Sequence, residues 1–293
     1  MPTRPRETTL LVNPAAGRGR GAHFAAVAAH RLRDAGFDVR IRTGRDGAEA
    51  EAIARETVAE GGELLVACGG DGLVHLAVQA VAGTDVALGV IPAGTGNDVA
   101  RYLGISRTDP VAAADTIVAS RRRRIDLARS GERYFVTVLA GGFDALVNER
   151  ANTMPWPRGQ MRYNLATLGE LRTFRPLHYT LDLDDEVRRV EAMLVAVGNG
   201  PSFGGGLRIT EGALLDDGLL DVVIIKAMSR PGLVRTYPKL FSGTHTSHPA
   251  YEHHRVRRVT VATPGIVAYA DGERFGALPL TIECAPAALE VLA

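Results

Sequence analysis

The segment LLVACGGDGLVHLAVQAV, residues 64–81, decides the fold. Its first residues are apolar on both faces, which is typical of a strand buried inside a sheet. Two glycines and Asp71 follow, and from Leu73 the apolar residues recur with the spacing of an amphipathic helix. A buried strand that passes through glycine directly into a helix is half of a βαβ unit. The segment therefore predicts a parallel sheet covered by helices.

The same alternation of strand and helix runs through the first part of the chain. Strands are expected at 9–14, 37–44, 63–70 and 86–94, and helices at 21–36, 48–62, 73–83 and 97–105. From Ile125 onward most apolar segments are strand-length and are separated by Gly, Pro, Asp and Asn, which indicates an antiparallel sandwich or barrel. Helical interruptions are expected near 143–151, 159–174 and 230–241. We predict an α/β nucleotide-binding domain over residues 1–127 and a mostly antiparallel β-sandwich domain over residues 128–293.

Composition narrows the class of protein. The 293 residues are 46% apolar and 23% charged, and 34 Lys and Arg against 33 Asp and Glu give a net charge of +1. This balance argues against a nucleic-acid partner, which usually meets a strongly basic domain. Two cysteines, Cys68 and Cys284, cannot make a disulfide framework, which favours a reducing cytoplasm. The opening residues predict a strand rather than a signal peptide, and no apolar run approaches the ~18 residues of a membrane span.

Three expected strand ends are rich in glycine: residues 13–21 (NPAAGRGRG), 68–74 (CGGDGLV) and 92–98 (PAGTGND). Ligands of open parallel sheets bind beyond the carboxyl ends of the strands. Glycine lets backbone N–H groups approach a phosphate, and the helix that follows adds its positive end. No Walker loop is present. Residues 17–22 match the dinucleotide pattern G-x-G-x-x-A, but Arg40 and Arg42 stand where its acid should lie.

Asp71 and Asp98 lie within the second and third loops. Carboxylates repel phosphate at short range, so a phosphate site tolerates them when Mg²⁺ lies between or when they position another group. Glycine amides, these acids and Thr95 together resemble a kinase site. The alternative is that each aspartate caps the N-terminus of the helix that follows it.

These motifs resemble the catalytic domain of the diacylglycerol kinase family, which includes bacterial soluble lipid kinases and sphingosine kinases. The resemblance continues through VGNGPSFGGGLRIT (197–210), ALLDDGLLDVVII (213–225) and YADGE (269–273), and so covers nearly the whole chain. It implies a nucleotide domain, a β-sandwich and an active cleft between them. It further implies an ATP- and Mg²⁺-dependent kinase of phospholipid metabolism that phosphorylates a hydroxyl of diacylglycerol or a related lipid, in peripheral contact with a membrane.

The resemblance also assigns roles to residues. Glu273 is implied to be the general base, with Asp71 and Asp98 completing the catalytic group. A structural Mg²⁺ is implied at the Asp217 carboxylate and the carbonyls of Leu214 and Leu219. From the residues alone, the segments around Asp217 and Glu273 are also simple Asp-Gly turns. The implied nucleotide-binding residues are Asn13, Pro14, Gly17, Thr43, Gly69, Gly70, Asp71, Gly72, Leu73, His75, Thr95 and Asn97.

The chain departs from the family pattern at Leu73 and His75, where threonine and then an acid or amide are usual. Leucine cannot donate a hydrogen bond to phosphate, so altered activity is one expectation. Two alternatives stay open: a kinase similar to NAD kinase, and a non-catalytic protein that binds nucleotide or lipid. The oligomeric state is open as well. The histidines of residues 245–254 are expected in a solvated loop, and the arginines of 121–124 in either a linker or a lipid-facing patch.

Overall fold

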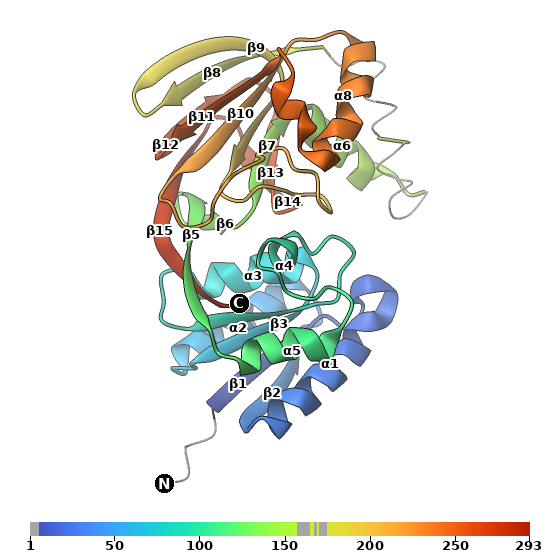
Figure 1. Cartoon of the computed structure of the whole chain (residues 1–293), viewed down its shortest axis with the longest axis vertical. Helices are drawn as coiled ribbons and strands as arrows, with labels where there is room; N and C mark the ends of the chain where they lie inside the picture. Colours follow the sequence, from blue (N-terminus) through green and yellow to red (C-terminus); the bar gives the residue numbers. More distant parts are fainter. Residues whose placement is uncertain (1–5, 157–164, 167–168, 170–174) are drawn as a thin grey trace.

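The structure is a computed structural model that describes residues 6–156, 165–166, 169 and 175–293. Figure 1 shows two units stacked along the long axis of the molecule, joined by two long strands. The N-terminal unit is a parallel sheet in the order β4-β3-β1-β2. Its strands are β1 (Arg6–Val12), β2 (Phe37–Thr43), β3 (Leu64–Gly69) and β4 (Ala87–Pro92).

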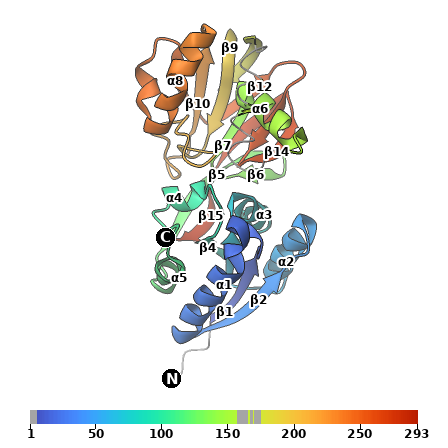
Figure 2. The same cartoon turned by 90° about the vertical axis from the view of Figure 1, so that its right-hand side faces the viewer.

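Helices cover both faces of this sheet, with α1 packed beside α5 and α2 beside α3 (Figure 2). β3 and β4 are buried along their whole length, as their continuous apolar runs predict. The helix α1 carries a face of small buried residues that lets it lie close to the sheet. The helices are α1 (Ala16–Asp34), α2 (Gly47–Ala59), α3 (Asp71–Val81), α4 (Asp98–Tyr102) and α5 (Pro110–Val118).

The second unit is built from antiparallel strands, with the described helices α6 (Phe143–Thr153) and α8 (Arg230–Ser242) on one side. Strand β9 is central and pairs with β7, β8 and β10. The helices α6 and α8 cover an apolar cluster over β7, β9 and β10. The strands are β6 (Arg133–Phe135), β7 (Val138–Gly142), β8 (Leu177–Leu183), β9 (Glu186–Gly198), β10 (Leu220–Lys226), β11 (Tyr251–Val256), β12 (Arg258–Ala262), β13 (Val267–Ala270) and β14 (Glu273–Ala277).

The two units share the antiparallel pair β5 (Arg122–Ser130) and β15 (Leu280–Leu292). The end of β15 returns to the first sheet, where Val291 lies beside Leu88 of β4. Its buried residues Leu289 and Val291 belong to the core of the N-terminal unit. A boundary near residue 127 therefore falls inside β5, and the last residues of the chain pack with the first unit.

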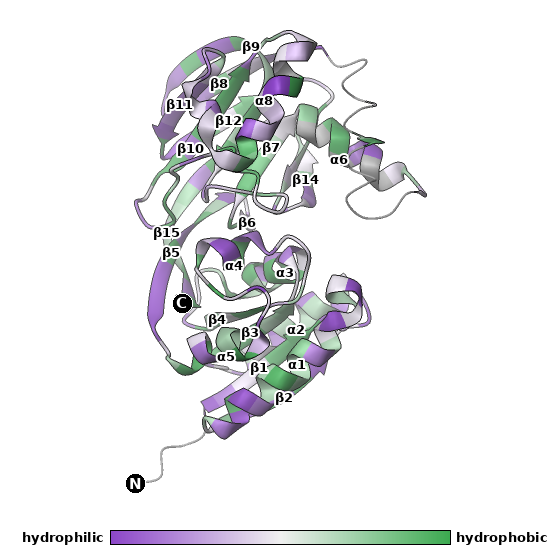
Figure 3. Ribbon diagram, turned by 45° about the vertical axis from the view of Figure 1, so that its right-hand side comes forward, coloured by the Kyte–Doolittle hydropathy of each residue, from purple (hydrophilic) through white to green (hydrophobic). Residues whose placement is uncertain are grey.

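The arginine run is part of this connection. Arg122 is paired with Glu290, Arg123 with Asp216, and Arg124 with both Asp85 and Glu290. Figure 3 shows the hydrophilic colour of β5 where this strand leaves α5 and runs toward the second unit. Because these guanidiniums already face carboxylates, the run is a charged strand rather than a free basic patch.

The predicted fold class, a parallel α/β unit followed by an antiparallel sandwich, is confirmed. The prediction of a solvated loop at residues 245–254 holds for 246–250, a segment with no buried residue. It is wrong for His245, which is fully buried, and for 251–254, where β11 forms. His253 and His254 alternate along that strand and pair with Asp221 and Glu252. Most of the helix expected at 159–174 lies outside the described residues. None of the described helices has the length and hydropathy that crossing a bilayer needs.

Candidate active site

A cleft of about 1240 Å³ lies between the two units. Pockets for a single small ligand usually measure about 300–1,000 Å³, so this one has room for two substrates. Its lower wall is formed by the three glycine-rich loops and the start of α2. The upper wall comes from β14, the loop before Leu207, and the helices α6 and α8.

The three loops pack directly on one another, and glycine permits this. A Cβ on Gly17 would lie 2.0 Å from the Ala93 carbonyl oxygen, and one on Gly94 would lie 2.5 Å from the Gly70 Cα. Gly17 also has a φ of +57°, which L side chains rarely adopt. Arg20 adds a side-chain contact by donating to the Gly94 carbonyl at 3.3 Å. The loops therefore form one rim, as their positions at neighbouring strand ends predict.

Asp71 caps a helix, but not the helix that it begins. Its Oδ2 accepts a hydrogen bond from the Asn97 N–H and its Oδ1 one from the Asp98 N–H, both at 2.7 Å. These N–H groups open α4, whereas Asp71 is the first residue of α3, whose cap residue is Gly70. The alternative interpretation, in which Asp71 caps its own helix, is therefore wrong. Burial and the nearby Asp98 carboxylate raise the pKa of Asp71 to about 6, against the lowering effect of the two N–H donors.

Asp98 ties the third loop to the second unit. Its Oδ2 accepts from the Gly205 N–H at 2.7 Å, and its Oδ1 accepts from the Ser202 hydroxyl at 3.2 Å. Arg101 reinforces the same junction by donating to the carbonyls of Gly96 and Gly205. Asp98, like Asp71, does not cap its own helix, because the N-cap residue of α4 is Asn97.

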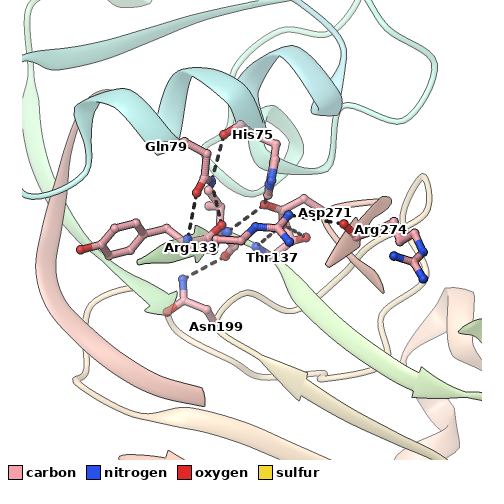
Figure 4. Close-up of polar contacts among 9 residues, drawn as sticks. His75, Gln79, Arg133, Thr137, Asn199, Asp271 and Arg274 are labelled. Atoms are coloured by element: carbon pink, nitrogen blue, oxygen red, sulfur yellow. Dashed lines mark hydrogen bonds and ion pairs between the residues drawn. The ribbon is translucent and has the colours of Figure 1, made fainter. Parts of the chain in front are cut away.

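Asp271, in the turn between β13 and β14, is fully enclosed. It accepts hydrogen bonds from His75 Nδ1 at 3.0 Å, from the Val136 and Thr137 N–H groups, and from the Thr137 hydroxyl (Figure 4). His75 comes from α3 in the other unit, and both side chains are at most 5% exposed. Burial acts to raise the pKa of Asp271, but the hydrogen bonds from His75 and Thr137 outweigh it and hold that pKa below its usual value.

Further contacts secure the same junction. The Gln79 side chain donates to the Tyr134 carbonyl at 2.8 Å and accepts from the Tyr134 N–H at 3.0 Å. Figure 4 shows α3, with His75 and Gln79, facing the segment that carries Thr137 and the turn that carries Asp271. The turn that precedes Glu273 is thus fixed to α3.

Glu273 is the first residue of β14, and its side chain is exposed. Its Oε1 lies against the second loop, since a Cβ on Gly72 would stand 2.8 Å from it. Among the described residues, no hydrogen bond or ion pair engages this carboxylate. A side chain that is placed over the glycine-rich rim and is free to accept a proton fits the role of general base.

The predicted nucleotide-binding residues divide into three groups. Those that line the cleft are Asn13, Gly17, Gly70, Asp71, Gly72, Leu73, His75 and Thr95. Thr43 and Pro14 are exposed beside the rim without lining the cleft, although Gly44 does line it. Gly69 and Asn97 are buried beneath the rim. Asn97 exchanges two hydrogen bonds with Gly94, which shapes the third loop from inside.

The departure at Leu73 has a structural reason. Its side chain is 6% exposed, and its Cδ2 would lie 2.7 Å from a Cβ on Gly69. Leu73 therefore packs into the core under the loop, although it also touches the cleft.

Asp271, Arg20 and Arg101 were missed by the sequence reasoning. An aspartate in an Asp-Gly turn two residues before a candidate base was the available signal for Asp271.

In the segment expected to hold a structural metal, both carboxylate oxygens of Asp217 already have protein partners. Asp217 Oδ1 accepts from the Leu219 N–H at 3.0 Å, and Oδ2 is ion-paired with Arg255. Leu214 is 48% exposed in the same turn. Within the described ranges, no three His, Cys, Asp or Glu side chains converge as metal ligands do. A cation at Asp217 would have to displace Arg255, so these residues do not form a ready metal site.

Glycine-rich amides, buried acids and a free carboxylate at one cleft define a phosphotransferase. Residues 7–130 match the family described as "Diacylglycerol kinase catalytic domain" and residues 137–293 the "YegS C-terminal NAD kinase beta sandwich-like domain". The chain belongs to the diacylglycerol kinase family and is a lipid kinase.

Curated relatives support this assignment over the full length. The chain is 44% identical to a Mycobacterium tuberculosis protein named "Diacylglycerol kinase" over 98% of this chain and 94% of the relative. It is 29% identical to a Bacillus subtilis protein of the same name, over 94% and 92%. A solved structure titled as a putative diacylglycerol kinase from Bacillus anthracis has a TM-score of 0.82 over 99% of this chain and 98% of its own. At 23% identity that likeness shows the fold alone.

Proposed function

We propose that this lipid kinase uses ATP with Mg²⁺ and transfers the γ-phosphoryl group to the hydroxyl of diacylglycerol or a closely related lipid. The observation that carries the proposal is the composition of the cleft. Its lower half is a rim of glycine amides, and its upper half is an apolar lobe lined by Phe143, Val147, Met193, Leu194, Leu207, Ile225, Tyr237 and Leu240. A phosphate donor suits the first half and acyl chains suit the second.

Glu273 lies where these halves meet. In the proposed reaction the lipid hydroxyl oxygen forms a bond to the γ-phosphorus as the bond between that phosphorus and the β–γ bridging oxygen breaks. The hydroxyl proton passes to the Glu273 carboxylate, and ADP leaves. The loop amides hold the phosphates in line, which is the main work of the protein in phosphoryl transfer.

The two loop acids fit a cation. Asp71 and Asp98 both line the cleft, and burial together with the Asp98 carboxylate raises the pKa of Asp71. Arg101 lies 3.5 Å from Asp98 Oδ1 and partly offsets the charge of the two acids. They are the residues that would face Mg²⁺ accompanying the nucleotide. The ion would neutralise the phosphate charge during transfer.

The apolar lobe disfavours NAD as the acceptor, because the ribose hydroxyls and the pyrophosphate of NAD would be left there without polar partners. The test is incubation with γ-labelled ATP and Mg²⁺ over diacylglycerol in mixed micelles and, separately, over NAD. Label in phosphatidate supports the proposal. Label in NADP, or ATP binding without transfer to any lipid, contradicts it.

A further inference from the structure

The helix α8 presents two different surfaces. Its inner side, with Thr236 and Leu240 buried, closes the apolar lobe. On its outer side Val234 is 54% and Phe241 47% exposed, and Pro238 is exposed between them. Residues four and seven apart share one face of a helix, so these three form an exposed apolar stripe. Phe241 also lines the cleft, so the stripe is continuous with the lobe.

Free positive charge lies beside this stripe. Residues 230–242 contain two arginines and one lysine and no acid. Arg235 and Lys239, four residues apart, are exposed, and among the described residues neither has an ion-pair partner. The arginines of β5, in contrast, are all neutralised by carboxylates. An apolar stripe flanked by unpaired cations is the pattern of a helix that lies in a membrane interface.

A second exposed apolar side chain lies just beyond α6, the other helix that lines the lobe. Trp156 is 74% exposed and follows the end of α6 by three residues. Figure 2 looks onto the face where α6 and α8 both cover the sandwich. Phe143 and Val147 of α6 and Leu240 of α8 line the lobe between them. Tryptophan favours the level of the lipid headgroups, so it suits the edge of a docked surface.

We propose that the outer face of α8, made of Val234, Arg235, Pro238, Lys239 and Phe241, docks on an anionic lipid bilayer. Docking there places the opening between α6 and α8 against the membrane, so the lipid acceptor enters the lobe without crossing water. The proposal rests on the proposed function for the role of the lobe.

A second copy of the chain fits this face less well. A symmetric contact through α8 would bring Arg235 and Lys239 of each copy against the same cations of the other. Anionic headgroups instead neutralise them, and each cation near such a surface strengthens binding about fivefold at low salt.

The test is co-sedimentation with phosphatidylcholine vesicles that contain or lack phosphatidylglycerol, at low and high salt. The variant is Val234→Ser combined with Lys239→Ser. The matched control is Val187→Ser combined with Arg189→Ser, an exposed valine and arginine at the start of β9; Figure 1 shows the β8–β9 hairpin on the side opposite α8. We expect salt-sensitive binding of the wild type to anionic vesicles, a loss of about tenfold or more in the α8 variant, and unchanged binding in the control.

Equal binding by the α8 variant, or an equal loss in the control, would overturn the proposal. So would a wild type that binds no vesicle but dimerises through α8, seen by light scattering at several concentrations. Turnover of the variants on a dispersed short-chain diacylglycerol separates the two ideas. If no protein turns it over while vesicle binding still depends on α8, the proposed function fails and the docking surface stands.

Discussion

Replacing Asp271 with glycine should loosen the junction between the two units. Asp271 has a φ of +52°, a conformation that glycine adopts without strain, so the substitution removes the carboxylate and leaves the turn intact. Four donors lose their acceptor: His75 Nδ1, two backbone N–H groups and the Thr137 hydroxyl. All of them are buried, so the loss cannot be repaired cheaply by water.

The size of the effect follows from that burial. A buried donor that loses its acceptor costs about 1–3 kcal/mol. Four such donors, some of which find new partners after relaxation, should together cost about 3–5 kcal/mol. At about 2–3 °C per kcal/mol for a chain of this size, the melting temperature should fall by roughly 6–15 °C. The pKa of Asp271 is lowered in the folded state, so its contribution is present above the unfolded value near 4 and is lost as the pH falls through the folded value. The difference from the wild type should be full at pH 7 and shrink in acid.

Thermal melts followed by circular dichroism measure this difference. Asp185→Gly is the matched control, because Asp185 is also left-handed, at φ +75°, but its side chain is 91% exposed. It should change the melting temperature by less than about 3 °C, since exposed pairs contribute little. A His75→Ala and Asp271→Gly cycle should be non-additive, because the two side chains touch. If the melting temperature of Asp271→Gly lies within 2–3 °C of the wild type, the pair contributes no more than roughly 1 kcal/mol, and its role in holding the units together is refuted. Strict additivity in the double-mutant cycle would refute it as well.

Three further predictions concern the loops and the metal. Asp71→Asn should nearly abolish activity with the fold retained. The pKa of Asp71 in the folded state is raised to about 6, so the stability that Asp71 contributes is present below pH 4 and is lost as the pH rises through 6. The melting temperature of Asp71→Asn relative to that of the wild type should therefore rise between pH 4 and pH 6. A difference in melting temperature that stays constant over this range contradicts the prediction. Leu73→Thr should strengthen ATP binding or raise kcat/KM by up to roughly 10- to 100-fold, and unchanged calorimetric affinity and kinetics would leave Leu73 as a core residue alone. Mg²⁺ added without nucleotide should leave the melting temperatures of the wild type and of Asp217→Ala unchanged, because Arg255 is paired with the Asp217 carboxylate; a Mg²⁺-induced rise in the wild type that Asp217→Ala abolishes would contradict this.

The fold could be predicted because its signals are local. Continuous apolar runs such as residues 64–69 identify buried parallel strands, and the glycines that follow mark the turns into helices. Strand β11 was missed because its residues, including His253 and His254, are polar. His253 pairs across the sheet with Asp221 of β10, and His254 pairs with Glu252 of its own strand. The pattern of a single strand does not reveal the first of these partners.

The rim of the site could also be predicted, but the partners of its acids could not. The sequence places Asp71 and Asp98 at strand ends, yet each acid binds a segment far away in the chain. Asp98 meets Gly205, and His75 meets Asp271, only because β15 and β5 hold the two units face to face. Contacts of that kind depend on how the two units pack, so they cannot be predicted from a local sequence pattern.

The central claim is that the cleft transfers phosphate to a lipid hydroxyl with Glu273 as the base. The direct measurement is the rate of labelled phosphatidate formation from γ-labelled ATP and diacylglycerol in mixed micelles, for the wild type and for Glu273→Gln, with ATP affinity measured by calorimetry on both. We expect turnover in the wild type, a fall of roughly 10²- to 10⁴-fold in Glu273→Gln, and ATP affinity that is nearly unchanged. Turnover of Glu273→Gln close to that of the wild type would leave Glu273 as a turn residue and contradict the mechanism.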